Sequence, residues 1–178
     1  MSARRLTVRL YGQVIGFVSQ SAHGAHRFRY LEDYAGPEAT PLSLSMPLSS
    51  REHTGKWIDP FLHGLLPDSA VVLERWAERF GVSPRNPFAL LEHMGLDCAG
   101  AVQLVSEGAG PLAAEREERL EPISRADVAA RIRQLRQEPA GWAVSGEHWS
   151  LAGAQSKFAL RAEGGGWFVA NGAAASTH

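Results

Sequence analysis

The sequence predicts an α+β fold in which a small, mainly antiparallel sheet comes first and short helices follow. In the first fifty residues, apolar side chains recur at every second position, which is typical of strands with one buried face. After about residue 58 they recur at helical spacing, and glycine or proline ends each stretch. With 178 residues, 44% of them hydrophobic and 21% charged, the chain can form one domain or two small lobes.

The opening strands follow from alternation. Residues 6–18 read as two strands joined at Gly12, and residues 26–31 read as a third strand. Residues 42–48 (LSLSMPL) predict a further strand with Leu42, Leu44 and Met46 on one face. The proline in this stretch would put it at the edge of the sheet or at a strand end.

Three helices are expected next. Pro60 suits the first turn of a short helix, PFLHGLL. Residues 72–80 carry an apolar stripe at helical spacing, and Gly81 is placed to end that helix. In NPFALLEHMG (86–95), Asn86 caps the helix and the following proline fills its first position.

A boundary is expected after the strand AVQLV (101–105), because residues 106–122 gain glycine, proline and charge and lose apolar periodicity. We therefore divide the chain into a subdomain at 1–107, a charged linker at 108–122 and a second segment at 123–178. In the second segment, Ser124 and Asp127 begin a helix with Val128, Ile132 and Leu135 as its stripe. Further strands are expected at 149–152, 157–161 and 167–170.

Composition excludes several classes of protein. Eighteen basic residues nearly balance nineteen acidic ones, so the formal net charge of −1 does not favour direct binding to nucleic acid or an anionic membrane. The single cysteine, Cys98, excludes an internal disulfide and suits a reducing compartment. We see no apolar run typical of a signal peptide or a membrane span, and we expect a cytoplasmic protein without a membrane partner.

The stretch SLAGAQSKFAL (150–160) carries the main candidate for chemistry. A phosphate site needs several backbone N–H groups directed into one concavity and a nearby cation. Small residues around Gly153 allow close approach of the backbone, and Lys157 supplies charge. No second glycine precedes the lysine, which excludes a Walker loop. From the residues alone, a plain hairpin turn is favoured over a glycine loop of the kind that covers nucleotide phosphates in protein kinases.

Four motifs in order, LSLSMPL, PFLHGLLPDS, NPFALLEHMGLDCAGAVQLV and SLAGAQSKFAL, resemble the N-terminal part of the HipA family. Members of that family are Ser/Thr protein kinases that act as toxins of type II toxin–antitoxin systems. The resemblance covers nearly the whole chain, and it shifts the interpretation of the loop toward nucleotide binding. It implies that residues 1–107 are an accessory subdomain and that 123–178 begin a protein-kinase-like N-lobe.

The resemblance also implies the roles of individual residues. Ser150 matches the serine that such kinases phosphorylate on themselves, with loss of activity. About two added negative charges would repel those of ATP and disturb the loop. The loop that contacts ATP matches Ala152, Gly153, Ala154, Gln155, Ser156 and Lys157.

The same resemblance implies ATP and Mg²⁺ as cofactors, a protein substrate such as an aminoacyl-tRNA synthetase, and a helix-turn-helix antitoxin as the partner through which DNA is mainly contacted. The catalytic and metal-holding residues of the family would follow the segment STH (176–178), so we expect no catalytic residue or metal site here and no activity from this chain alone. It is expected to be a fragment of a kinase. The alternative is a stand-alone module that binds and regulates a kinase core.

Other candidates have simpler interpretations. His23 and His26 lack further clustered ligands, so we expect a solvated turn and not a metal site. Cys98 is expected to be a buried thiol, and Asp97 is expected to accept hydrogen bonds from loop backbone. The strand at 167–169 is expected to have an exposed edge, which self-association would cover.

Overall fold

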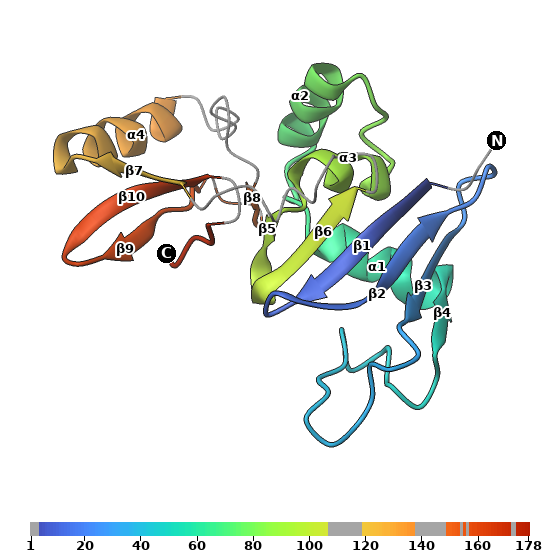
Figure 1. Cartoon of the computed structure of the whole chain (residues 1–178). Coiled ribbons are helices and arrows are strands. Elements are labelled where there is room, and N and C mark those ends of the chain that lie inside the picture. The colour runs from blue at the N-terminus through green and yellow to red at the C-terminus, as the bar shows by residue number, and fades with distance from the viewer. Residues whose placement is uncertain (1–3, 107–118, 138–148, 154, 156, 172–173) are drawn as a thin grey trace.

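A computed structural model describes residues 4–106, 119–137, 149–153, 155, 157–171 and 174–178. It contains a larger sheet with three helices and a smaller sheet beside α4, Arg125–Gln137 (Figure 1). The fold is α+β, as predicted, and its sheet pairs are antiparallel with one parallel exception. Among the described residues, no helix has the length and apolar character needed to cross a membrane.

The larger sheet has seven strands in the order β4-β3-β2-β1-β6-β5-β8. Their bounds, in chain order, are β1 Arg4–Leu10, β2 Gln13–Gln20, β3 His26–Tyr30, β4 Glu52–Thr54, β5 Asp97–Cys98, β6 Val102–Ser106 and β8 Trp149–Ser150. The predicted hairpin of β1 and β2 is confirmed, and its turn uses the left-handed backbone of Tyr11 and Gly12, with φ of 51° and 78°. The short strands β4 and β5 were not anticipated.

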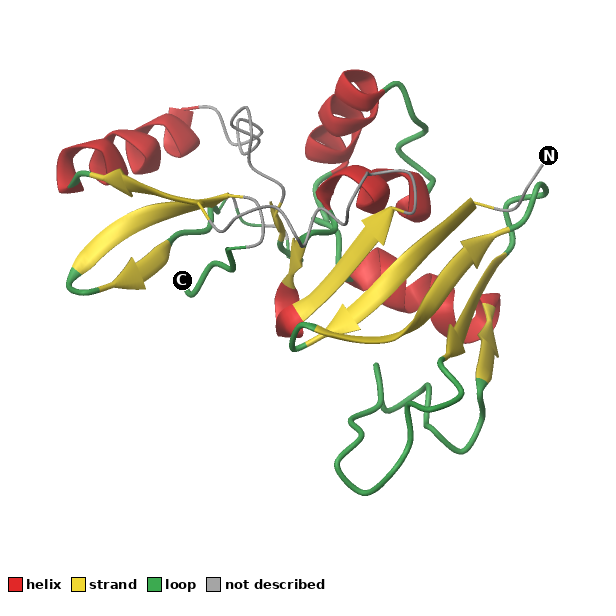
Figure 2. Cartoon of the chain, in the orientation of Figure 1, coloured by secondary structure: helices red, strands yellow, loops and turns green. Residues whose placement is uncertain are grey.

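Helices α1 (Gly55–Gly64), α2 (Ala70–Phe80) and α3 (Pro87–Met94) pack together beside this sheet, as Figure 2 shows. Gly81 ends α2 with a φ of 66°, and the Asn86 side chain caps α3 by accepting a hydrogen bond from the Ala89 amide, so both predictions are confirmed. The prediction for Pro60 was wrong. α1 begins five residues earlier, and Pro60 lies inside it.

The stretch 42–48 is not a strand. Its backbone turns so that Ser43 and Met46 form an isolated bridge, and Leu44 is 95% exposed while Met46 is fully buried. The buried hydroxyl of Tyr30 holds this turn, because it donates to the Met46 carbonyl at 2.7 Å and accepts from the Leu42 amide at 2.8 Å. This contact from a distant strand overrides the local alternation.

The smaller sheet has the order β7-β10-β9. Its strands are β7 Arg119–Ile123, β9 Arg161–Glu163 and β10 Gly166–Asn171. The strand expected at 157–161 therefore begins only at its last residue, and Ile132 in α4 is exposed although it was expected to pack inward.

The prediction of an exposed strand edge at 167–169 was also wrong. β10 lies in the middle of the smaller sheet, because β7 pairs with one side of it and β9 with the other. Residues 167–169 of β10 therefore offer no free edge for self-association. Residues 119–122, expected in the linker, belong to β7, and residues 107–118 lie outside the described part of the chain.

Candidate functional site

Ser150 lies where the candidate loop begins, at the end of β8. This strand pairs in parallel with β5, with Cys98 opposite Ser150. The Ser150 side chain is fully buried, and its hydroxyl donates to the Leu65 carbonyl at 2.7 Å. The start of the loop is therefore fixed to the first subdomain by both backbone and side chain.

Gly153 continues this attachment. It forms a parallel bridge with Pro67, and its carbonyl accepts a hydrogen bond from the Asp68 amide at 3.3 Å. Its φ of 108° is a conformation that favours glycine. The motif LLPD (65–68) thus supports the loop, a contact that no local pattern indicated.

Lys157 lies across the loop. Its ammonium group donates to the Ala152 carbonyl, and a Cβ atom at Gly153 would meet Lys157 Nζ at 2.8 Å. Ala152 and Gln155 are exposed, while Ala154 and Ser156 lie outside the described residues. Small residues, a left-handed glycine and a lysine therefore lie together, which is an arrangement suited to an anionic group.

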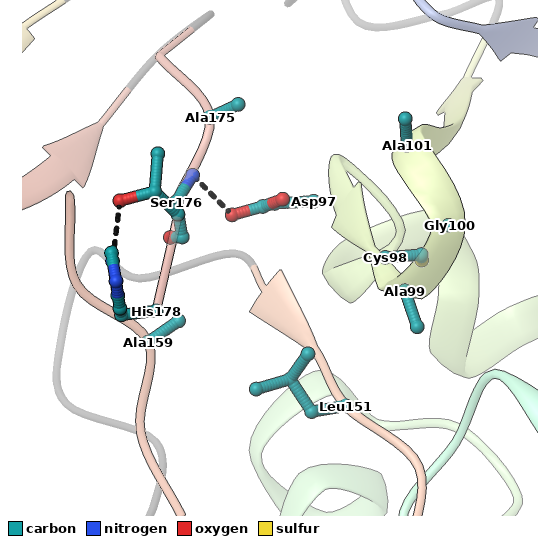
Figure 3. A pocket seen from close by; sticks show the side chains of 11 residues that line it. Asp97, Cys98, Ala99, Gly100, Ala101, Leu151, Ala159, Ala175, Ser176 and His178 are labelled. Atoms are coloured by element: carbon teal, nitrogen blue, oxygen red, sulfur yellow. Dashed lines mark hydrogen bonds between the residues drawn. The ribbon is translucent and has the colours of Figure 1, made fainter. Parts of the chain in front are cut away.

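A pocket of about 300 Å³ lies beside the loop (Figure 3). One wall is the turn at 97–101 and another is the segment 175–178. Asp97 connects these walls, because its Oδ2 accepts a hydrogen bond from the Ser176 amide at 3.0 Å. The prediction that Asp97 bonds backbone is confirmed, but its partner is 79 residues away, which no local pattern indicated.

Cys98 is buried, and its sulfur lies 3.6 Å from the Gly95 carbonyl. Burial raises the pKa of its thiol strongly, with a smaller contribution from neighbouring Asp97. The prediction of a buried thiol is confirmed. A nucleophilic cysteine needs an accessible thiolate, which this environment disfavours.

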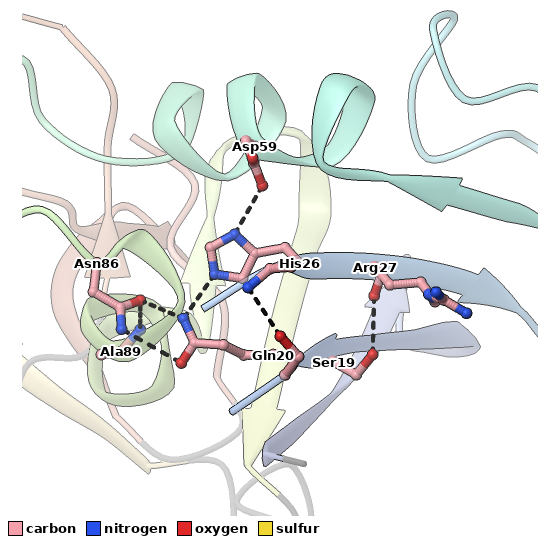
Figure 4. Close-up of polar contacts among 9 residues, drawn as sticks. Ser19, Gln20, His26, Arg27, Asp59, Asn86 and Ala89 are labelled. Atoms are coloured by element: carbon pink, nitrogen blue, oxygen red, sulfur yellow. Dashed lines mark hydrogen bonds and ion pairs between the residues drawn. The ribbon is translucent and has the colours of Figure 1, made fainter. Parts of the chain in front are cut away.

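The prediction of a solvated turn at His26 was wrong. His26 belongs to β3 and is only 8% exposed, with Nδ1 2.8 Å from Asp59 Oδ1 and Nε2 2.8 Å from Gln20 Nε2. Gln20 Nε2 also donates to Asn86 Oδ1, the atom that caps α3 (Figure 4). His26 is therefore a structural link between α1, two strands and α3.

Comparisons with known proteins agree with this architecture. The sequence model of the HipA N-terminal domain matches residues 6–105, more than half of the chain. The chain belongs to the HipA N-terminal domain family. The match spans the larger sheet from β1 to β6 together with the three helices beside it.

Individual relatives extend beyond that domain. "Putative kinase Y4mE" of Sinorhizobium fredii is 37% identical over 163 residues, which cover 90% of this chain and 39% of the relative. "Serine/threonine-protein kinase toxin HipA" of Shewanella oneidensis is 37% identical over 144 residues, covering 78% of this chain and 30% of the relative. A solved structure, "N-terminal domain of HipA toxin", aligns with 60% of this chain and 95% of its own at 25% identity and a TM-score of 0.45.

These relatives are named as kinases, so the HipA family to which the chain belongs includes Ser/Thr kinase toxins. The chain spans well under half of the length of either relative.

Proposed function

We propose that this chain is the N-terminal part of an ATP-dependent Ser/Thr protein kinase of the HipA toxin type. The observation that carries the proposal is the loop at 150–157, where left-handed Gly153 and Lys157 lie together on a support formed by the first subdomain. The named kinase relatives support it, because their similarity to this chain extends beyond the N-terminal domain.

The loop fits a triphosphate chemically. Glycine at 153 leaves room for an anionic group close to the backbone, since, among the described residues beyond its chain neighbours, only the flexible end of Lys157 lies within 4 Å of a Cβ placed there. ATP, when bound with Mg²⁺, would supply the phosphoryl group and the counter-charge for its transfer. This chain's own contribution is to bind and orient the phosphates through loop amides and the Lys157 ammonium group. The catalytic groups would come from the remainder of the kinase, so the chain alone is expected to be inactive.

Ser150 is the proposed site of autophosphorylation. Its hydroxyl is fully buried and bonded to the Leu65 carbonyl, so it must leave this position before a phosphate can be attached. A phosphate carries about two negative charges at neutral pH. Returning that charge to the buried site is unfavourable. The modified segment would therefore stay detached from β5, and the loop would lose its support.

The proposed partners follow from the toxin class. A helix-turn-helix antitoxin would bind the kinase and provide most contacts to DNA, in keeping with this chain's net charge of −1. The proposed substrate is a protein of the translation apparatus, with aminoacyl-tRNA synthetases as the first to test. The names of the relatives, both kinases and one of them a toxin, support the class from which this partner and this substrate are proposed.

The test is a pair of glycine variants in the full-length kinase. Gly153→Val should abolish ATP binding, measured by calorimetry, because it fills the space beside the loop backbone. Gly165→Val is the matched control, since Gly165 also has a positive φ, of 80°, but lies in the β9–β10 turn, where no described atom beyond its chain neighbours is within 4 Å of a Cβ placed there. Unchanged ATP affinity in Gly153→Val would reject the phosphate role. Full ATP affinity in the isolated 178-residue chain would show that the remainder of the kinase is not needed for ATP binding.

A further inference from the structure

We propose that Asp97 is a positioning residue for the nucleotide loop, because it fixes both the strand that enters the loop and the segment that carries the loop's exit. The inference rests on the proposed function, since it gives Asp97 an effect on ATP affinity. Asp97 lies outside the loop itself, and its side chain acts through Ser176.

The entrance of the loop is held through the backbone of Asp97. In the parallel pairing of β5 with β8, Asp97 lies opposite Trp149 and Cys98 lies opposite Ser150. Ser150 is the residue from which the loop begins. The position of β5 therefore sets where the loop enters.

The exit of the loop is held through the side chain of Asp97. Its Oδ2 accepts from the Ser176 amide at 3.0 Å. The segment that contains Ser176 runs beside residues 160–162, because the Leu160 amide donates to the His178 carbonyl at 2.7 Å and the Ala162 amide donates to Thr177 Oγ1 at 2.9 Å. The residues that follow the loop are thus tied to a segment that Asp97 holds.

Side-chain packing alone does not connect the turn at 97–101 to the segment 175–178. The pocket of about 300 Å³ separates the turn at 97–101 from the segment 175–178, and small apolar side chains such as Ala99, Ala101 and Ala159 line it. Figure 3 shows the Asp97 carboxylate directed across this space toward Ser176. A hydrogen bond to an ionised acceptor is roughly twice as strong as a neutral one. We therefore expect this bond, and not side-chain contact, to set the separation of the two walls.

Hydrogen exchange of the 178-residue chain tests the geometry without nucleotide. Asp97→Ala should speed amide exchange about tenfold in the segment 174–178 and at residues 160–162, which bond to that segment, whereas the loop entrance should change less, because it pairs with the Asp97 backbone that the substitution keeps. Asp97→Asn keeps an acceptor oxygen and should change exchange less than Asp97→Ala does. Ser176→Pro removes the donor N–H and should reproduce Asp97→Ala. Ser176→Ala is its matched control, because it keeps the amide and should match wild type.

ATP affinity of the full-length kinase tests the consequence. Asp97→Ala should raise the KM for ATP about tenfold, as expected for loss of one charged hydrogen bond, and should change kcat less. Asp97→Asn should keep most of the wild-type affinity for ATP. Unchanged exchange at 174–178 in Asp97→Ala, or an equal rise in exchange rate in Asp97→Ala and Asp97→Asn, would overturn the inference. The inference would also be overturned if Asp97→Ala changed amide exchange but left the KM for ATP unchanged. A wild-type kinase that binds no ATP would instead reject the proposed function, while the exchange result would still decide whether Asp97 holds the loop.

Discussion

Replacing Ser150 by alanine measures how firmly the loop is attached to the first subdomain. The Ser150 hydroxyl is fully buried and donates to the Leu65 carbonyl at 2.7 Å. Removing it deletes one buried hydrogen bond and leaves that acceptor without this donor, which costs about 1–2 kcal/mol. For a chain of this size each kcal/mol lowers the melting temperature by about 2–4 °C. We therefore expect Ser150→Ala to melt about 2–8 °C lower than wild type.

Circular dichroism melts and urea titrations of the 178-residue chain provide the assay. The matched control is Ser50→Ala, because the Ser50 hydroxyl also donates to a backbone carbonyl, that of Glu52 at 3.0 Å, but is exposed. Its loss should cost less than about 0.5 kcal/mol. Equal effects of the two substitutions would refute the buried contact. Ser150→Asp extends the test, because a buried charge costs several kcal/mol and should detach β8 from β5.

Three further outcomes follow from the described residues. Cys98 should resist iodoacetamide at pH 8 until the chain unfolds, because burial raises the pKa of its thiol above the ordinary 9.0. Above about pH 9 the unfolded chain loses the thiol proton while the folded chain keeps it, so the free energy of unfolding should fall as the pH rises. Nitrogen-15 spectra of His26 should show the proton on Nδ1, facing Asp59, and a proton on Nε2 instead would contradict the network. Gly95→Ala should destabilise the fold by about 1–3 kcal/mol, since its Cβ would lie 2.5 Å from the Leu91 carbonyl oxygen. Gly64→Ala is the control and should not destabilise the fold, because no described atom beyond its chain neighbours and the backbone of its own helix lies within 4 Å of a Cβ placed there.

The tautomer of His26 follows from a backbone N–H group whose direction is fixed by the helix α3. The Ala89 amide donates to Asn86 Oδ1, so the oxygen of the Asn86 amide must face the start of α3. Gln20 Nε2 donates to the same oxygen and lies 2.8 Å from His26 Nε2, which must then accept. The imidazole proton is left on Nδ1. Helix capping thereby sets the tautomer of a histidine in another element.

Elements with local signals were predicted well. The α2 helix ends at Gly81 and α3 begins at Asn86 because caps act within a few residues of the chain. The Ser124 hydroxyl accepts from the Asp127 amide at the start of α4, as its spacing predicted. The candidate loop was recognised from its motif, and the family it indicated is confirmed.

Elements that depend on distant partners were missed. β5 has two residues and exists because β6 and β8 pair with it, so no window of sequence contains its cause. Most of β7 falls within the predicted linker, because the pairing that makes it a strand comes from β10. Its sequence, RLEPI, contains a proline and two charged residues and has no clear apolar alternation.

The sequence by itself determined the end of α2, the start of α3, the first hairpin, the burial of Cys98 and the family, because each depends on residue types at short spacing or on short motifs. Only the tertiary structure decided that LLPD supports the loop, that Tyr30 turns the stretch 42–48, and that Asp97 reaches Ser176. These contacts join residues 12 to 86 positions apart, where the pairing is selected by the packed sheet and its helices and not by the local chain.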